Sequence, residues 1–226
     1  MAKLIIVPTP IGNLDDITLR AIKVLTDADY ILAEDTRKTS FLLKHFDINN
    51  KLVPFHKFNE HKSLERTIEQ IEGGNTVALV SDAGTPGISD PGYLLINACV
   101  HAGIETECLP GATALIPAIV NSGFSCEKFI FEGFLPHKKG RQKRIESIKE
   151  ESRTIVYYES PHRIIKTLKQ LLELLEEDRN VCVCRELTKL HEEFFRGTLS
   201  QAITHFEQKA IKGEIVLVLE GYKASK

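Results

Sequence analysis

Short apolar runs alternate with amphipathic stretches along the first half of the chain. The stretch 15–28 carries apolar residues at the three- and four-residue spacing of a helix face, whereas 77–80 is a continuous apolar run short enough for a buried strand. Glycines at 73–74 and 103 stand where helix ends are expected. This alternation predicts a parallel α/β unit. Its expected strands are 4–7, 30–33, 52–55, 76–81 and 105–109, and its expected helices are 15–28, 36–46, 63–72 and 91–102.

The second half of the chain continues the alternation after a boundary. An apolar helix that contains Pro117 ends at Ser122-Gly123, and we place the boundary in this region. The chain is therefore expected to form two α/β domains, 1–114 and 115–226, with a cleft between them. In the second domain we expect strands at 128–133, 154–158, 180–185, 193–197 and 214–219, and helices from 138, over 161–176 and from Ser200.

Composition places the protein among ordinary globular chains. It has 226 residues, of which 42% are apolar and 27% charged, which is enough for a sizeable core. There is no signal-peptide layout, and no apolar run approaches the ~18 residues of a membrane helix, so we expect a cytoplasmic protein with no membrane partner. The five cysteines form no C-x-x-C pair and are expected as reduced core thiols, with no metal site.

The most distinctive pattern lies where three expected strands end. Pro8-Thr9-Pro10 follows the first strand, the segment 81–92 with its three glycines and two prolines follows the fourth, and Pro110-Gly111-Ala112 follows the fifth. Loops of this composition let backbone groups approach a ligand closely, and parallel strands bring their carboxyl ends to one edge of the sheet. Any one of these loops could be an ordinary turn. Together they predict one shared cofactor pocket.

Several familiar cofactor sites are missing from the sequence. It has no G-x-x-x-x-G-K-[ST] loop, and no strand end carries G-x-G-x-x-G with an acidic residue about 20 positions further on. It also lacks H-E-x-x-H, zinc-like Cys/His spacing and G-x-S-x-G. Nucleotide-phosphate, metalloenzyme and serine-hydrolase functions are therefore disfavoured.

Positive charge is local, because the formal net charge of the whole chain is only -2. The segment 138–144 holds five cations, and the helices expected from Asp35 and from Ser160 both begin with cations, although a cation at a helix N-terminus costs about 0.3–1 kcal/mol. These are either solvated surface charges or binding sites for an anion such as RNA phosphate.

Seven segments, in order along the chain, resemble the ribosomal RNA 2'-O-ribose methyltransferases of the tetrapyrrole methylase superfamily. They are 8–18, 33–37, 81–92, 110–112, 132–136, 158–163 and 185–189. The resemblance implies a homodimer whose two α/β domains hold a mostly parallel N-terminal sheet and a mixed C-terminal sheet. It also implies S-adenosylmethionine as cofactor, bound in the interdomain cleft, and methylation of a cytidine ribose in the decoding region of 16S rRNA.

The same resemblance assigns cofactor contacts by position. The superfamily usually has Gly-Asp-Pro where this chain has Gly84-Thr85-Pro86. Any role of that aspartate therefore does not transfer to this chain. The threonine in its place favours an RNA substrate over a tetrapyrrole. The expected cofactor contacts are Pro8, Gly84, Thr85, Pro86, Gly87, Ile88, Thr113, Ala114, Leu187, Gly213 and Glu214.

Methyl transfer from a sulfonium is an in-line displacement that neutralises charge. Holding the two reactants in line contributes on the order of 7–11 kcal/mol, and a general base adds about 10²- to 10⁴-fold. Candidates for the base, or for orienting the hydroxyl, are Asp35, Asp82 and Glu159, with His56 and His162 behind them. Asp90 is instead expected to be a helix N-cap with Pro91 in the first turn.

The substrate is expected to be structured 16S rRNA or an assembled small ribosomal subunit, since only 7% of the residues are aromatic and few bases could be read by stacking. Two alternatives remain open: a precorrin-type tetrapyrrole C-methyltransferase, and a non-catalytic RNA-binding assembly factor. The expected RNA contacts are Arg37, Lys38, His56, Lys57, Lys138, Lys139, Arg141, Lys143, Arg144, His162 and Arg163.

Overall fold

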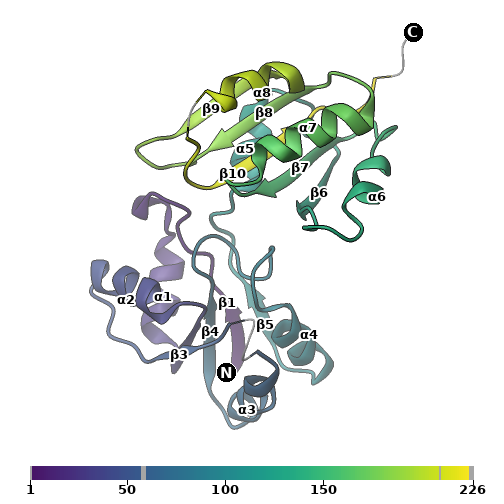
Figure 1. Cartoon of the computed structure of the whole chain (residues 1–226). Coiled ribbons are helices and arrows are strands. Elements are labelled where there is room, and N and C mark those ends of the chain that lie inside the picture. Colours follow the sequence, from purple (N-terminus) through teal and green to yellow (C-terminus); the bar gives the residue numbers. More distant parts are fainter. Residues whose placement is uncertain (1, 57–59, 209, 224–226) are drawn as a thin grey trace. The chain divides into compact units, whose positions relative to one another are not determined.

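The computed structural model describes residues 2–56, 60–208 and 210–223, and the chain divides into two compact units, Met1–Thr113 and Ala114–Lys226 (Figure 1). None of the helices in these described ranges is long and apolar enough to cross a membrane.

The first unit is built on a five-stranded sheet in which every strand pairing is parallel, in the order β3-β2-β4-β1-β5. Alternate strand residues face two separate cores. One core includes Ile5 and Ile31 and lies under α1 and α2, and the other includes Leu4 and Leu32 and lies under α3 and α4 (Figure 1). The strands are β1 (Lys3–Ile6), β2 (Tyr30–Ala33), β3 (Leu52–Pro54), β4 (Thr76–Val80) and β5 (Thr106–Cys108), and the helices are α1 (Leu19–Asp27), α2 (Thr36–His45), α3 (Glu60–Glu72) and α4 (Tyr93–His101).

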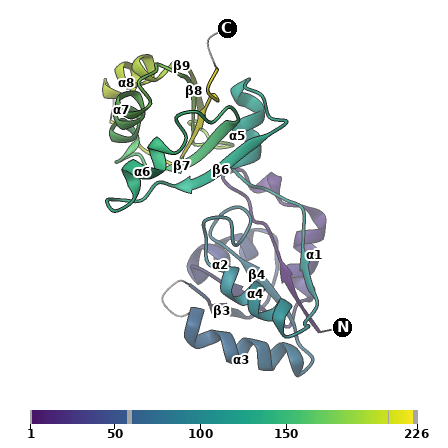
Figure 2. The same cartoon turned by 90° about the vertical axis from the view of Figure 1, so that its right-hand side faces the viewer.

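The second unit holds a mixed sheet of order β6-β7-β10-β8-β9, in which β6 and β7 are parallel and the other pairs antiparallel. Helices α6, α7 and α8 cover one face, and α5 lies on the other, where Ala118 contacts Cys184 (Figure 2). The strands are β6 (Phe129–Phe134), β7 (Thr154–Glu159), β8 (Asn180–Arg185), β9 (Glu193–Thr198) and β10 (Ile215–Leu219), and the helices are α5 (Leu115–Ser122), α6 (Arg141–Glu146), α7 (Ile164–Leu175) and α8 (Leu199–Glu207).

The predicted fold class is confirmed, with corrections at helix starts. Helix α1 begins at Leu19 after a separate 3₁₀ turn, because the Thr18 side chain accepts from the Ala21 N–H and caps it there. Gly92, with φ of 130°, is the N-cap of α4, so the N-cap role expected of Asp90 is wrong. Cys108 and Cys126 are exposed, so the expected core placement holds only for Cys99, Cys182 and Cys184.

Candidate active site

Backbone hydrogen bonds tie together the loops that follow β1, β4 and β5. Thr9 and Gly84 exchange N–H···O bonds of 3.0 and 2.9 Å, and the Thr9 hydroxyl donates to the Ser81 carbonyl at 3.2 Å. The Thr85 hydroxyl donates to the Ala112 carbonyl at 3.0 Å. Three segments that are far apart in the sequence therefore form one platform at the carboxyl edge of the parallel sheet.

Glycine is required in this platform for two different reasons. Gly84 has φ of +80°, a left-handed conformation that other residues adopt only with strain. Gly111 is close to Pro8, and a Cβ at position 111 would stand 2.6 Å from the Pro8 Cβ. The expected cofactor residues Pro8, Gly84 and Thr85 thus lie together, with the Thr113 backbone close to Gly84.

The platform is uncharged and partly apolar. Residues 84–88 and 110–115 carry no charge. Ile88 is 36% exposed, and its N–H donates to the Thr85 carbonyl within a turn. Apolar side chains with a few well-placed polar groups are typical of small-molecule sites. Pro86, Gly87 and Ile88 continue this loop, and Ala114 is the N-cap of α5 in the second unit. Contact of these residues with S-adenosylmethionine stays a prediction.

Charged groups gather at the neighbouring strand ends of the same sheet. The Asp82 carboxylate accepts from the Asp35 N–H at 3.0 Å and from Lys38 Nζ at 2.7 Å. Asp35 caps α2 through the Arg37 N–H and forms a two-bond pair with the Arg37 guanidinium. This pairing lowers the pKa of Asp35, which makes it a weaker base.

Sequence reasoning passed over Glu34, the first residue after β2. Its Oε2 accepts from the Asp82 N–H at 3.4 Å, and burial, followed by the charge of Asp82, raises its pKa. The charge of His56, the second residue after β3, acts in the opposite direction. The position of Glu34 in the sequence could have identified it, because Glu34 follows β2 at the same sheet edge where Asp82 follows β4. Lys57 lies outside the described residues.

In the second unit, Glu159 and Arg141 are buried in one polar network. Glu159 is 3% exposed and accepts from the Ser160 N–H at 2.8 Å and from the Thr167 hydroxyl at 2.5 Å. Arg141 is 4% exposed and donates to Gln170, to Thr167 and to the Pro136 carbonyl. The structure therefore does not support the expected RNA contact of Arg141, and the contacts of Glu159 favour an anchoring role over that of a base.

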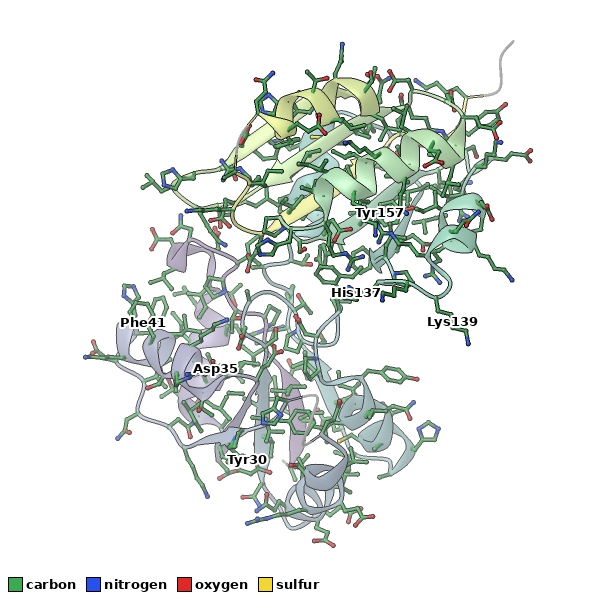
Figure 3. The ribbon with its side chains drawn as sticks, viewed as in Figure 1. Tyr30, Asp35, Phe41, His137, Lys139 and Tyr157 are labelled. Carbon is green, nitrogen blue, oxygen red and sulfur yellow. The ribbon has the colours of Figure 1, made fainter. Side chains whose placement is uncertain are left out.

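Arg163 shares this anchoring role. Its Nη2 donates to the Leu135 carbonyl at 2.5 Å, and its Nε lies 3.4 Å from the Glu159 carboxylate. Arg163 is the N-cap of α7, so the helix begins at Ile164. The cations expected in the first turn of this helix, His162 and Arg163, therefore precede the helix. Arg144 pairs with Glu132. Lys138, Lys139, Lys143 and His162 are exposed, and Figure 3 shows Lys139 extending away from the loop before α6.

The remaining expected cofactor residues lie near one another at the ends of β8 and β10. The Glu186 and Glu214 backbones are joined by a 2.9 Å bond, and the Glu214 N–H also donates to the Glu186 carboxylate at 2.8 Å. Leu187 is buried, and Gly213 has φ of +93°. Glu186 and Thr188 also have positive φ, which is uncommon outside glycine and occurs often at functional sites.

Comparison with known proteins assigns the fold. The family model for tetrapyrrole (corrin/porphyrin) methylases matches residues 3–203. The methyltransferase CobJ superposes with a TM-score of 0.74 at 20% identity, covering 100% of this chain and 97% of that one. Uroporphyrin-III C-methyltransferase from Thermus thermophilus, solved with S-adenosylhomocysteine, superposes with a TM-score of 0.69 at 17% identity, covering 96% and 97%.

Curated relatives are much closer in sequence. The ribosomal RNA small subunit methyltransferase I of Thermotoga maritima is 52% identical, over 98% of this chain and 99% of that protein. The protein of the same name from Escherichia coli O157:H7 is 45% identical, over 98% of this chain and 79% of its own length. The chain therefore belongs to the tetrapyrrole methylase family and, within it, to the group of proteins named ribosomal RNA small subunit methyltransferase I.

Proposed function

We propose that this protein transfers the methyl group of S-adenosylmethionine to the 2'-oxygen of a cytidine ribose in the decoding region of 16S rRNA. The observation that carries the proposal is the 52% identity to a named ribosomal RNA methyltransferase over nearly the whole chain. A bound sulfonium supplies an activated methyl group, so the protein has to align the two reactants and accept one proton.

Two features of the structure support the assignment of residues. The uncharged platform around Pro8, Gly84, Thr85 and Thr113 suits the cofactor, and Leu187, Gly213 and Glu214 are proposed to complete its contacts. The exposed cations Lys138, Lys139, Lys143 and His162 suit phosphate, which positions RNA without reading its sequence. We also propose that the protein acts as a homodimer in the cytoplasm, on 16S rRNA or on the small ribosomal subunit.

The test is methyl transfer from radiolabelled S-adenosylmethionine to small ribosomal subunits purified from cells that lack this protein. The expected result is label on a single cytidine ribose, together with calorimetric binding of the cofactor to the free protein. Binding of RNA without label would indicate a non-catalytic assembly factor. In a parallel reaction that offers a precorrin as the acceptor, label on the precorrin would indicate a tetrapyrrole enzyme. Subunits from cells that contain the protein are the control, because their site is already methylated.

A further inference from the structure

Two acidic residues, Glu34 and Asp82, follow the paired strands β2 and β4 and contact each other. These strands are paired in parallel with Ala33 opposite Val80, so Glu34 and Asp82 leave the sheet at the same edge. The Asp82 N–H donates to Glu34 Oε2 at 3.4 Å. Adjacent carboxyls with different surroundings commonly divide the roles of proton acceptor and fixed anion.

The surroundings of these two groups do differ. Both oxygens of Asp82 are engaged, one by the Asp35 N–H and the other by Lys38 Nζ, so the Asp82 side chain is fixed in place. Glu34 is half-buried, and among the described residues only the Asp82 N–H donates to it. Glu34 is therefore the member of the pair that can exchange a proton without breaking an ion pair.

The pair lies next to the proposed cofactor platform. Asp82 is two residues before Gly84, whose backbone is bonded to Thr9, and all of these groups lie in the loops at one edge of the first unit's sheet. A hydroxyl held over the ends of β2 and β4 would therefore lie beside a methyl donor held over the ends of β4, β1 and β5.

We propose that Glu34 is the general base of the methyl transfer and that Asp82, held by Lys38, positions it; this inference rests on the proposed function. The ribose oxygen attacks the methyl carbon and forms the new carbon–oxygen bond, while the carbon–sulfur bond breaks and its electron pair stays on sulfur. The hydroxyl proton passes to the Glu34 carboxylate and from there to solvent.

The electrostatics of Glu34 suit this role. Burial is the largest cause that raises its pKa, and the negative charge of Asp82 raises it further, whereas the Asp82 N–H and the charges of Lys38 and His56 lower it. A base is most effective when its pKa lies near the working pH, so a raised glutamate pKa favours proton abstraction. The pKa of Asp35 is instead lowered by Arg37.

The test compares Glu34→Gln with the wild type in single-turnover methyl transfer. Glutamine keeps an oxygen that can accept from the Asp82 N–H but cannot take the proton. We expect the rate to fall by about 10²- to 10⁴-fold, with unchanged binding of S-adenosylmethionine and of the ribosomal substrate. The wild-type rate should fall as pH drops through the pKa of Glu34, and the residual rate of Glu34→Gln should lack that decline. Asp29→Asn is the matched control, because this carboxylate lies at the other end of β2 and accepts from the Thr76 N–H at 2.7 Å.

A second readout is independent of activity. In ¹³C NMR of the carboxyl groups, the signal that Glu34→Gln removes should titrate above the ordinary glutamate pKa of about 4.3, and Asp82→Asn should shift that titration to lower pH. A wild-type rate and pH profile in Glu34→Gln, or loss of cofactor binding in that variant, would overturn the role of Glu34 while leaving the proposed function standing. Absence of methyl transfer by the wild type would instead overturn the proposed function.

Discussion

The carboxylates near the strand ends occupy similar places in the fold and have different partners. Asp35 pairs with an arginine, and Glu159 is buried among a hydroxyl, a backbone N–H and two guanidinium groups. Glu34 has no cationic partner within ion-pair distance among the described residues. The charged form of Glu34 therefore lacks the ion pair that the other two carboxylates have, which has a consequence for folding as well as for chemistry.

We expect Glu34→Gln to be more stable than the wild type at neutral pH. Because the pKa of Glu34 is raised on folding, the folded state binds this proton more tightly than the unfolded state does. Stability of the wild type must then fall as pH rises from the ordinary glutamate pKa of about 4.3 through the raised folded value. Thermal unfolding should give a higher Tm for Glu34→Gln at pH 8 and a difference that closes toward pH 4. An equal or lower Tm at pH 8 would contradict the prediction, and Asp29→Asn should gain no stability.

Among the elements, the strand-end loops depend on a few cross-links. The bond from the Thr85 hydroxyl to the Ala112 carbonyl joins the β4 loop to the β5 loop. Thr85→Val keeps the shape of the side chain and removes the bond, which is worth about 0.5–1.5 kcal/mol. We expect the affinity for S-adenosylmethionine, measured by calorimetry, to fall about two- to tenfold. Thr26→Val is the control, since the Thr26 hydroxyl only donates to the Ile22 carbonyl on the exposed side of α1. An equal effect of the two variants would show that the cross-link does not shape the site.

The loop before α6 is held by buried charge. Arg141 and Arg163 together bind the carbonyls of Leu135 and Pro136, and Glu159 balances them. Arg141→Met would remove the ion pair of Arg141 with Glu159 and its bond to the Pro136 carbonyl, and would leave Arg163 in place. Breaking a buried ion pair costs about 3–5 kcal/mol. We expect a clear loss of free energy of unfolding in denaturant titrations.

Lys143→Met is the matched control for this prediction, because it removes the same charge from the exposed side of the same helix. It should leave stability unchanged and weaken RNA binding. If Arg141→Met kept wild-type stability and weakened RNA binding as Lys143→Met does, Arg141 would be a direct RNA contact after all.

The sequence pattern predicted most helices and strands, because hydrophobic periodicity and the positions of turn residues are local properties of the chain. The strands 30–33 and 180–185 coincide with β2 and β8, since short apolar runs between turn residues have few other buried conformations. The partners of Arg141 and Glu34 could not be predicted in this way. Arg141 bonds to Gln170, 29 residues away, and Glu34 to Asp82, 48 residues away. Such pairs depend on strand order and helix packing, which no short segment specifies.

For the whole molecule, a formal net charge of -2 gives no general attraction to RNA, so binding has to depend on where the cations stand. The exposed pair Lys138 and Lys139 lies in the loop that the buried arginines hold, and we expect both to contact phosphate. Replacing both by glutamine should weaken binding to the small ribosomal subunit and flatten the dependence of log K on log salt by about 1.4–1.8, since each phosphate contact contributes about 0.7–0.9. The control is Lys23→Gln with Lys44→Gln, which removes the same charge from exposed positions of α1 and α2. Equal slopes for the two double variants would mean that only net charge matters, and the placement of the loop would then have no role in holding the substrate.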